Sequence, residues 1–310
     1  HHSEIIAHRV GEPFGTIILA VSITVIEVAI IISLMTTGGK EYAAFARDTV
    51  YAAAMLILNG IVGLSLFLGG QKFHTQTFSP HSVKIALVSL VSIVAFTMII
   101  PTFTAGQTGP YYTEKQLLFE IFACLVIYTA FISAQTNKHR EYFISGDSDD
   151  SESPHNAISN LSLTISVVFL LVSLIIVVLL AKSLSPQIEL LVVSNGLPKS
   201  LVGIIIAAVI LLPEGIAAVN AARNNRLQTS LNLALGSALA SIGLTIPAVS
   251  IASYIYGFPL ILGLDLLPII LLVISIFTVM LSLIGGRSNS VYGVVLLVNL
   301  MAYVFLTINP

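Results

Sequence analysis

Apolar residues dominate long stretches of this chain, and polar residues gather in short segments between them. A helix needs about 20 consecutive apolar residues to cross a membrane. The short polar segments, such as TTGGKE and GGRSNS, carry the Gly and Asn that are typical of turns. The pattern therefore predicts an all-α, polytopic bundle of nine transmembrane helices: Pro13–Met35, Val50–Gly69, Val83–Ile100, Gln116–Ala134, Leu161–Ala181, Ser200–Ala222, Leu231–Tyr256, Leu266–Ile284 and Val291–Ile308.

Composition agrees with a lipid bilayer as the surroundings, because 56 % of the residues are hydrophobic and only 9 % are charged, against about a quarter charged in soluble domains. A net charge of −2 without basic runs gives no sign of a nucleic-acid partner. Cys124 is the one cysteine, which excludes an intramolecular disulfide and a CxxC metal site. We expect no resident cofactor, and the sequence leaves the oligomeric state open.

One polar insert, EYFISGDSDDSESPHN, interrupts the chain near its middle. Eight of the Lys and Arg residues fall on the same side of the predicted bundle as the N-terminus and this insert, against five on the other side. Positively charged loops stay in the cytoplasm, so we expect the insert to be cytoplasmic. It is interpreted either as a solvated linker or as a cation sensor.

Two acidic residues lie deep within predicted helices: Glu27 midway along the first and Glu214 midway along the sixth. Glu120 and Asp265 fall near helix starts, where we expect headgroups or water within reach. The two acidic helices are five spans apart, so they should cross the membrane in opposite directions. This is the signature of an inverted repeat, whose substrate site lies at the midplane. The symmetry also predicts a further helix before His1.

The helix after each acidic helix carries a similar polar pattern. Asn59 precedes Gly63 by four positions, and Asn232 precedes Gly236 by four. Hydroxyl groups follow closely, from Ser65 in the first half and Ser237 in the second. Such asparagines often only join helices. In matched positions beside the acids, these amide and hydroxyl oxygens become candidate ligands for a hard cation such as calcium or sodium.

A carboxylate at the bilayer centre costs at least about 2.5 kcal/mol. It persists when it is protonated, paired with a cationic side chain or bound to a cation. No Lys or Arg lies within the body of a predicted helix, which leaves a proton or a metal cation for Glu27 and Glu214. The alternative is that each is a protonated acid that only joins two helices.

Pro213 and Gly215 flank the second acid in AAVILLPEGIAAV. A proline removes one intrahelical donor, which would free the carbonyl oxygen of Val209, and that of Ala208 beside it, to coordinate a cation. The alternative is a simple packing kink.

The segments AHRVGEPFGTIILAVSITVIEV and LLPEGIAAVNAARNNRLQTSLNLALGSALASIGLTIP, with the acidic insert, resemble the bacterial ChaA-type branch of the calcium/cation:proton antiporters, in the cation/calcium exchanger superfamily. The resemblance implies two inverted halves of five core helices, located in the bacterial inner membrane. We accordingly divide the chain into a first repeat (1–135, lacking its first helix), an acidic cytoplasmic linker (136–157) and a second repeat (158–310).

The resemblance also places the family's paired acids on Glu27 and Glu214, and its polar followers on Asn59 and Asn232. It implies a secondary antiporter that expels a cation in exchange for protons, with calcium first and sodium or potassium as alternatives. A sodium-driven exchanger without proton coupling, a passive channel and an intramembrane enzyme are the rival interpretations. The enzyme is disfavoured because the sequence contains no HExxH motif and no deep Ser–Lys or Ser–His pair.

Overall fold

The computed structural model describes residues 14–38, 42–104, 111–138, 140–143 and 200–309, and isolated positions between 165 and 198. These ranges are helical apart from turns, connecting loops and one isolated bridge between Thr77 and Arg287. The elements are α2 (Phe14–Gly38), α3 (Phe45–Met55), η2 (Leu56–Ile61), α4 (Val62–Phe73), α5 (Pro80–Val94), η3 (Ala95–Ile99), α6 (Ile100–Phe103), α7 (Glu114–Ser133), η4 (Ala134–Lys138), α8 (Arg140–Phe143), α10 (Ser200–Arg223), α11 (Leu227–Ala240), η5 (Ser241–Thr245), α12 (Ile246–Tyr256), α13 (Leu266–Leu283) and α14 (Ser290–Ile308).

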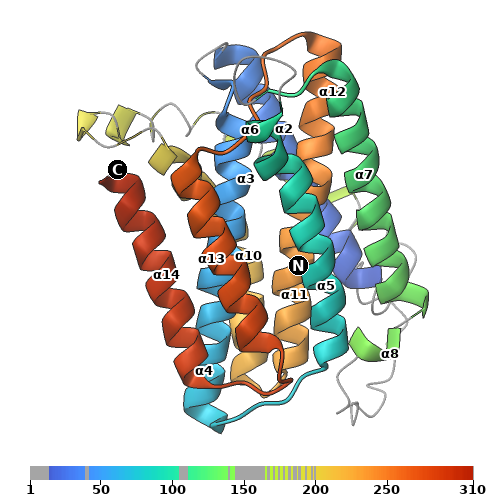
Figure 1. Ribbon diagram of the computed structural model, residues 1–310, viewed down its shortest axis with the longest axis vertical. Helices are drawn as coiled ribbons and strands as arrows, with labels where there is room; N and C mark the ends of the chain where they lie inside the picture. Colours follow the sequence, from blue (N-terminus) through green and yellow to red (C-terminus); the bar gives the residue numbers. More distant parts are fainter. Residues whose placement is uncertain are drawn as a thin grey trace.

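Consecutive helices join into long rods that run along the long axis of a bundle (Figure 1). Seven rods in the described part of the chain are long and apolar enough to cross a membrane, and α2 adds 25 helical residues. Eight of the nine predicted spans are thereby found as helices, whereas most of Leu161–Ala181 lies outside the described residues. The chain is a multi-pass, all-α membrane protein.

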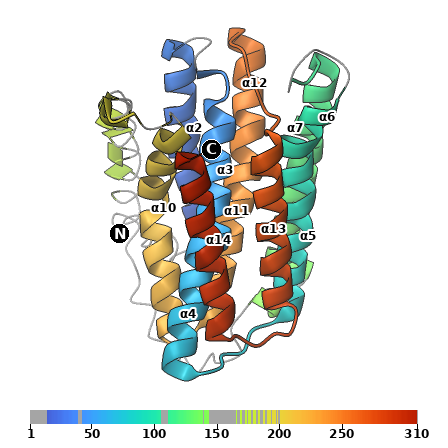
Figure 2. The ribbon, with the colours of Figure 1, turned by 60° about the vertical axis from the view of Figure 1, so that its left-hand side comes forward.

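Two rods form the centre of the bundle: Phe45–Phe73, which joins α3, η2 and α4, and Leu227–Tyr256, which joins α11, η5 and α12. In each of them 78 % of the most apolar stretch is buried, against 17 % in α14. Both contain a π-helical turn near mid-length, a feature that is rare and often found at functional sites. Figure 1 shows α14 on one side of these rods and α5 and α7 on the other. In Figure 2, α14 passes in front of the rod that contains α3 and α4.

Hydrogen bonds join the two halves at both ends of the bundle. At the end that carries the α10–α11 turn, Gln76 donates to the carbonyl of Ala222 at 2.8 Å. At the opposite end, Arg47 donates to the carbonyl of Gly263 at 2.7 Å. Helix α10 ends at the first of these ends and α2 at the second, so the two acidic helices run in opposite directions, as predicted for an inverted repeat.

Helices α4 and α14 approach closely where two glycines meet. A Cβ atom on Gly293 would lie 2.6 Å from the carbonyl oxygen of Gly63 and 2.8 Å from the Cα atom of Phe67. Both are backbone atoms, which no rotamer change can move away. Small residues allow this kind of contact between membrane helices, where packing drives association.

Candidate functional site

Glu27 of α2 points into the centre of the bundle and is 3 % exposed. Ser241 donates to both of its carboxyl oxygens, at 2.8 and 2.6 Å. Thr245, one turn further along η5, donates to one of them at 3.0 Å. The first half thus supplies the acid, and the central rod of the second half supplies both hydroxyl groups.

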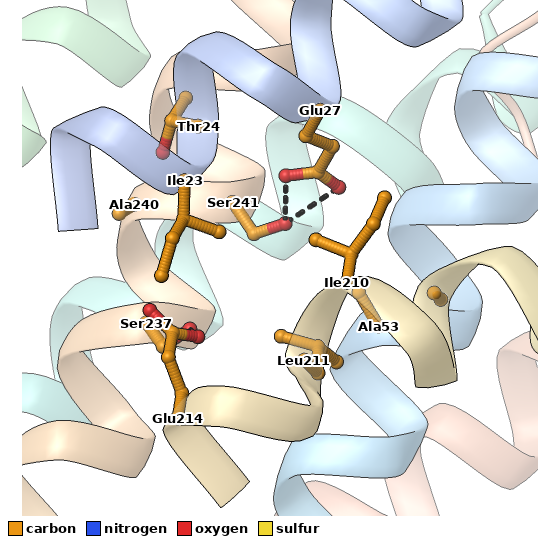
Figure 3. Close-up of a pocket in the computed structure, with 11 residues that line it drawn as sticks. Ile23, Thr24, Glu27, Ala53, Ile210, Leu211, Glu214, Ser237, Ala240 and Ser241 are labelled. Atoms are coloured by element: carbon orange, nitrogen blue, oxygen red, sulfur yellow. Dashed lines mark hydrogen bonds between the residues drawn. The ribbon is translucent and has the colours of Figure 1, made fainter. Parts of the chain in front are cut away.

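Glu214 of α10 approaches the same region from the opposite side and is 6 % exposed. Its carboxyl group accepts a hydrogen bond from Ser237 of α11. Both acids line one cavity of about 10 Å³ between α2, α3, α10 and the central rod Leu227–Tyr256 (Figure 3). That volume is about the room that one water molecule needs.

The walls of the cavity decide which ligand it suits. Besides the two acids, its polar lining comes from Thr24, Ser237 and Ser241, and the rest is Ala, Ile and Leu. Among the described residues, no Lys, Arg or His pairs with either carboxyl group; the one ion pair found there, between Arg47 and Asp48, lies at the start of α3. Carboxylate and hydroxyl oxygens without nitrogen or sulfur suit a hard cation.

Asn59 is buried but does not line the cavity. Its amide nitrogen donates to Ser275 of α13 at 2.9 Å and to the carbonyl of Met55 at 3.2 Å. Its amide oxygen is buried without a hydrogen-bond partner. A buried acceptor without a partner costs free energy. Because Asn59 does not line the cavity, its amide oxygen would bind a cation there only after the side chain or its helix had moved.

Asn232 and Ser65 also lie away from the cavity. Asn232 accepts from Gln228 at 2.7 Å and donates to the carbonyl of Phe143 at 2.6 Å, in the first turns of α11. Ser65 accepts from Ser230 at 2.9 Å. Of the six residues predicted to bind the cation, the structure therefore gathers Glu27, Glu214 and Ser237 and separates Asn59, Asn232 and Ser65.

The two asparagines are not equivalent in the repeat. Asn59 is the fifteenth residue of the rod Phe45–Phe73, whereas Asn232 is the sixth residue of Leu227–Tyr256. The fifteenth residue of the second rod is Ser241. The shared Asn-x-x-x-Gly pattern therefore compares residues at different points along their rods. The residue near the middle of the second rod, as Asn59 is of the first, is Ser241, the hydroxyl partner of Glu27.

Pro213 lies within an unbroken α10. Its own side chain and that of Val209 are exposed, Val209 to 60 %, whereas Leu211 and Glu214 are buried. The Val209 side chain thus lies on the outward side of the helix, not on the side that lines the cavity. Neither Val209 nor Ala208 is among the residues that line the cavity.

Sequence reasoning missed Ser241 and Thr245, although a signal was present. Ser237, Ser241 and Thr245 follow one another at intervals of four residues, and residues four apart share one face of a helix. A repeated hydroxyl at this spacing identifies the polar side of the rod more directly than the lone asparagine does.

Comparisons with known proteins show the family to which this chain belongs. Residues 1–137 and 165–309 match the family described as sodium/calcium exchanger protein. The protein y4hA of Sinorhizobium fredii is 42 % identical over 100 % of this chain and 84 % of its own length. The sodium-potassium/proton antiporter ChaA of Escherichia coli is 33 % identical over 97 % of this chain and 82 % of its own.

A solved structure shares the fold. The crystal structure of the H⁺/Ca²⁺ exchanger CAX superposes with a TM-score of 0.75 at 16 % identity, over 98 % of this chain and 76 % of that one. The chain belongs to the sodium/calcium exchanger family, and it is a membrane transporter of inorganic cations rather than an enzyme.

Proposed function

We propose that this chain is a secondary antiporter that exchanges a cytoplasmic cation for protons, with calcium as the first candidate and sodium or potassium as the others. One observation carries the proposal: a carboxyl group from each half lines a single buried cavity, and no basic side chain among the described residues neutralises either acid. The relatives support the same reading, since one is named a sodium-potassium/proton antiporter and a structural neighbour an H⁺/Ca²⁺ exchanger.

Glu27 and Glu214 hold either the cation, as carboxylates, or protons, as neutral acids. Two negative charges in one small, water-poor cavity repel each other and lose hydration. The empty site with both acids ionised is therefore high in free energy, and the protein rarely switches the side to which the site is open while it is in this state. This cost couples the cation flux to the opposite proton flux, while movement of the two halves exposes the cavity to each side in turn.

The proposal also includes the orientation of the bundle in the membrane. Lys72 donates to the carbonyl of Arg223 at 2.9 Å, so two of the basic residues assigned to the cytoplasmic side lie together at one end of the bundle. The positive-inside rule then places this end in the cytoplasm of a bacterial inner membrane, and with it the acidic linker.

The experiment uses everted membrane vesicles with a fluorescent pH indicator, to which calcium, sodium and potassium are added separately. The wild type should release protons on addition of its cation. Glu27→Gln and Glu214→Gln should each abolish this response. Glu114→Gln, which changes an exposed acid in the first turn of α7, is the matched control and should respond as the wild type does.

Two results would contradict the proposal. Robust exchange by both cavity variants would separate transport from the carboxyl pair. Calcium flux that depends on sodium and moves no protons would instead identify a sodium-driven exchanger.

A further inference from the structure

A third carboxyl group is buried in the bundle, outside the cavity. Glu120 of α7 is 1 % exposed, although its place near a helix start suggested contact with headgroups or water. Ser250 of α12 donates to it at 3.5 Å, and Cys124, one turn further along α7, donates to it at 3.4 Å. The transport scheme above gives this acid no role.

All three buried glutamates are contacted by one rod. Along Leu227–Tyr256, Ser237 binds Glu214, Ser241 and Thr245 bind Glu27, and Ser250 binds Glu120. We call these four residues the hydroxyl spine. Ser250 is five residues beyond Thr245, which is about 7.5 Å along a helix axis. A shift of the rod near Ser250 therefore reaches the hydroxyl groups that hold Glu27.

Helix α7 also packs directly on the π-helical turn that carries Ser241 and Thr245. A Cβ atom on Gly243, within η5, would lie 3.4 Å from the Tyr128 ring of α7. Glu120 and Tyr128 of α7 thus contact one side of the rod Leu227–Tyr256, and Glu27 of α2 contacts a different side of the same rod. Because π-helical turns are often found at functional sites and α7 packs on this one, we expect the position of α7 to influence the geometry at Glu27.

No described cationic group faces Glu120. Its titratable neighbours are Cys124 and Tyr112, and the Tyr112 hydroxyl donates to the carbonyl of Phe96. The η3, α6 and η5 segments contain no ionisable side chain. The elements around α7 carry the remaining ionisable groups, and these are exposed or lie at the far ends of α5 and α7. They are Tyr254 and Tyr256 of α12, His81 and Lys84 of α5, Lys138 of η4, and Arg140, Glu141 and Tyr142 of α8.

We propose that Glu120 is a proton-binding positioning residue, which sets the pH dependence of transport by controlling how α7 holds the hydroxyl spine. The inference rests on the proposed role of Glu27 and Glu214. In its neutral form Glu120 joins α7 to α12 through Ser250. Once ionised, it is an uncompensated charge between apolar helices, so the two helices separate and the spine moves away from Glu27.

The test measures the initial rate of radiolabelled cation flux as a function of pH, in proteoliposomes that contain the full chain. Flux of the wild type should fall on the alkaline side. Glu120→Gln cannot ionise and is close in shape, so it should keep a flux within about threefold of the wild type at lower pH. Its alkaline fall should disappear or move upward by about one pH unit or more. Glu114→Gln should follow the wild-type curve.

A second variant keeps the proposal testable if Glu120→Gln does not fold, as judged by gel filtration. Ser250→Ala retains the acid but removes the contact through which Glu120 joins α7 to α12. In this variant the flux at lower pH should already be reduced toward the alkaline level of the wild type, and the alkaline fall should be smaller. Curves of both variants that coincide with the wild type would overturn the inference. Because cation flux is followed directly, a wild type that moves cations without protons would contradict the antiporter proposal separately.

Discussion

The contact between α4 and α14 allows a quantitative prediction for Gly293→Ala. The new Cβ atom would lie 2.6 Å from the Gly63 oxygen and 2.8 Å from the Phe67 Cα atom, whereas ordinary contact begins at 3.4 Å. The Phe67 backbone nitrogen would lie closer still, so the two helices would have to separate locally by more than about 0.8 Å, the difference between 3.4 and 2.6 Å. Overpacking of this kind typically costs about 1–3 kcal/mol, and more where backbone cannot yield.

In domains of about 150–250 residues, 1 kcal/mol corresponds to about 2–4 °C in Tm. Gly293→Ala should therefore melt roughly 2–12 °C below the wild type. The assay is a thermal melt in detergent with a thiol-reactive fluorogenic dye. Cys124 is the one cysteine of this sequence and is fully buried, so its labelling reports unfolding.

The matched control is Gly236→Ala, in α11, where a Cβ atom would meet nothing within 4 Å. Alanine is about 1 kcal/mol better than glycine in a helix interior, so this variant should melt at or slightly above the wild-type temperature. If Gly293→Ala behaved like Gly236→Ala, the close packing of α4 on α14 would be refuted.

Two further predictions concern polar residues on the central rods. Ser241→Ala should slow cation exchange by about 5- to 10-fold, because a hydrogen bond to a charged group is worth about 1–1.5 kcal/mol more than one to a neutral group. The control Ser65→Ala removes another buried hydroxyl that lies away from the cavity, and its exchange rate should stay within about twofold of the wild type. Equal losses in the two variants would argue against the role assigned to Ser241. Asn232→Ala should lower the free energy of unfolding by about 1–3 kcal/mol, because Gln228 and the Phe143 carbonyl each lose a hydrogen-bond partner. The apparent cation affinity of this variant, measured by calorimetry, should not change. A large loss of affinity would show that Asn232 is a ligand after all.

The bundle and its paired acids could be predicted from the sequence because membrane insertion leaves few alternatives. Hydrophobic length determines the spans, and a carboxyl group in hydrocarbon has to have a function or a partner. Glu27 and Glu214 therefore stood out without any knowledge of the packing. Their opposite crossing directions followed from counting spans.

The remaining polar residues of the site could not be ranked in this way, because their role depends on helix rotation and depth. Asn59 and Ser241 occupy matching depths, but a local sequence pattern paired Asn59 with Asn232 instead. Pro213 looked like a source of a free ligand, yet the rotation of α10 turns that side outward. Glu120 was placed near water by its sequence position, whereas contact with α12 buries it.

The volume of the cavity bears on how the proposed exchanger would discriminate between ions. About 10 Å³ accommodates a bare ion or a single water molecule, but not an ion that keeps its hydration shell. Whatever enters has to exchange nearly all of its water for protein oxygen, so discrimination becomes a matter of dehydration energy as much as of charge. Magnesium gives up its water reluctantly, so the cost of dehydration disfavours magnesium in this cavity however well the carboxylates would bind it.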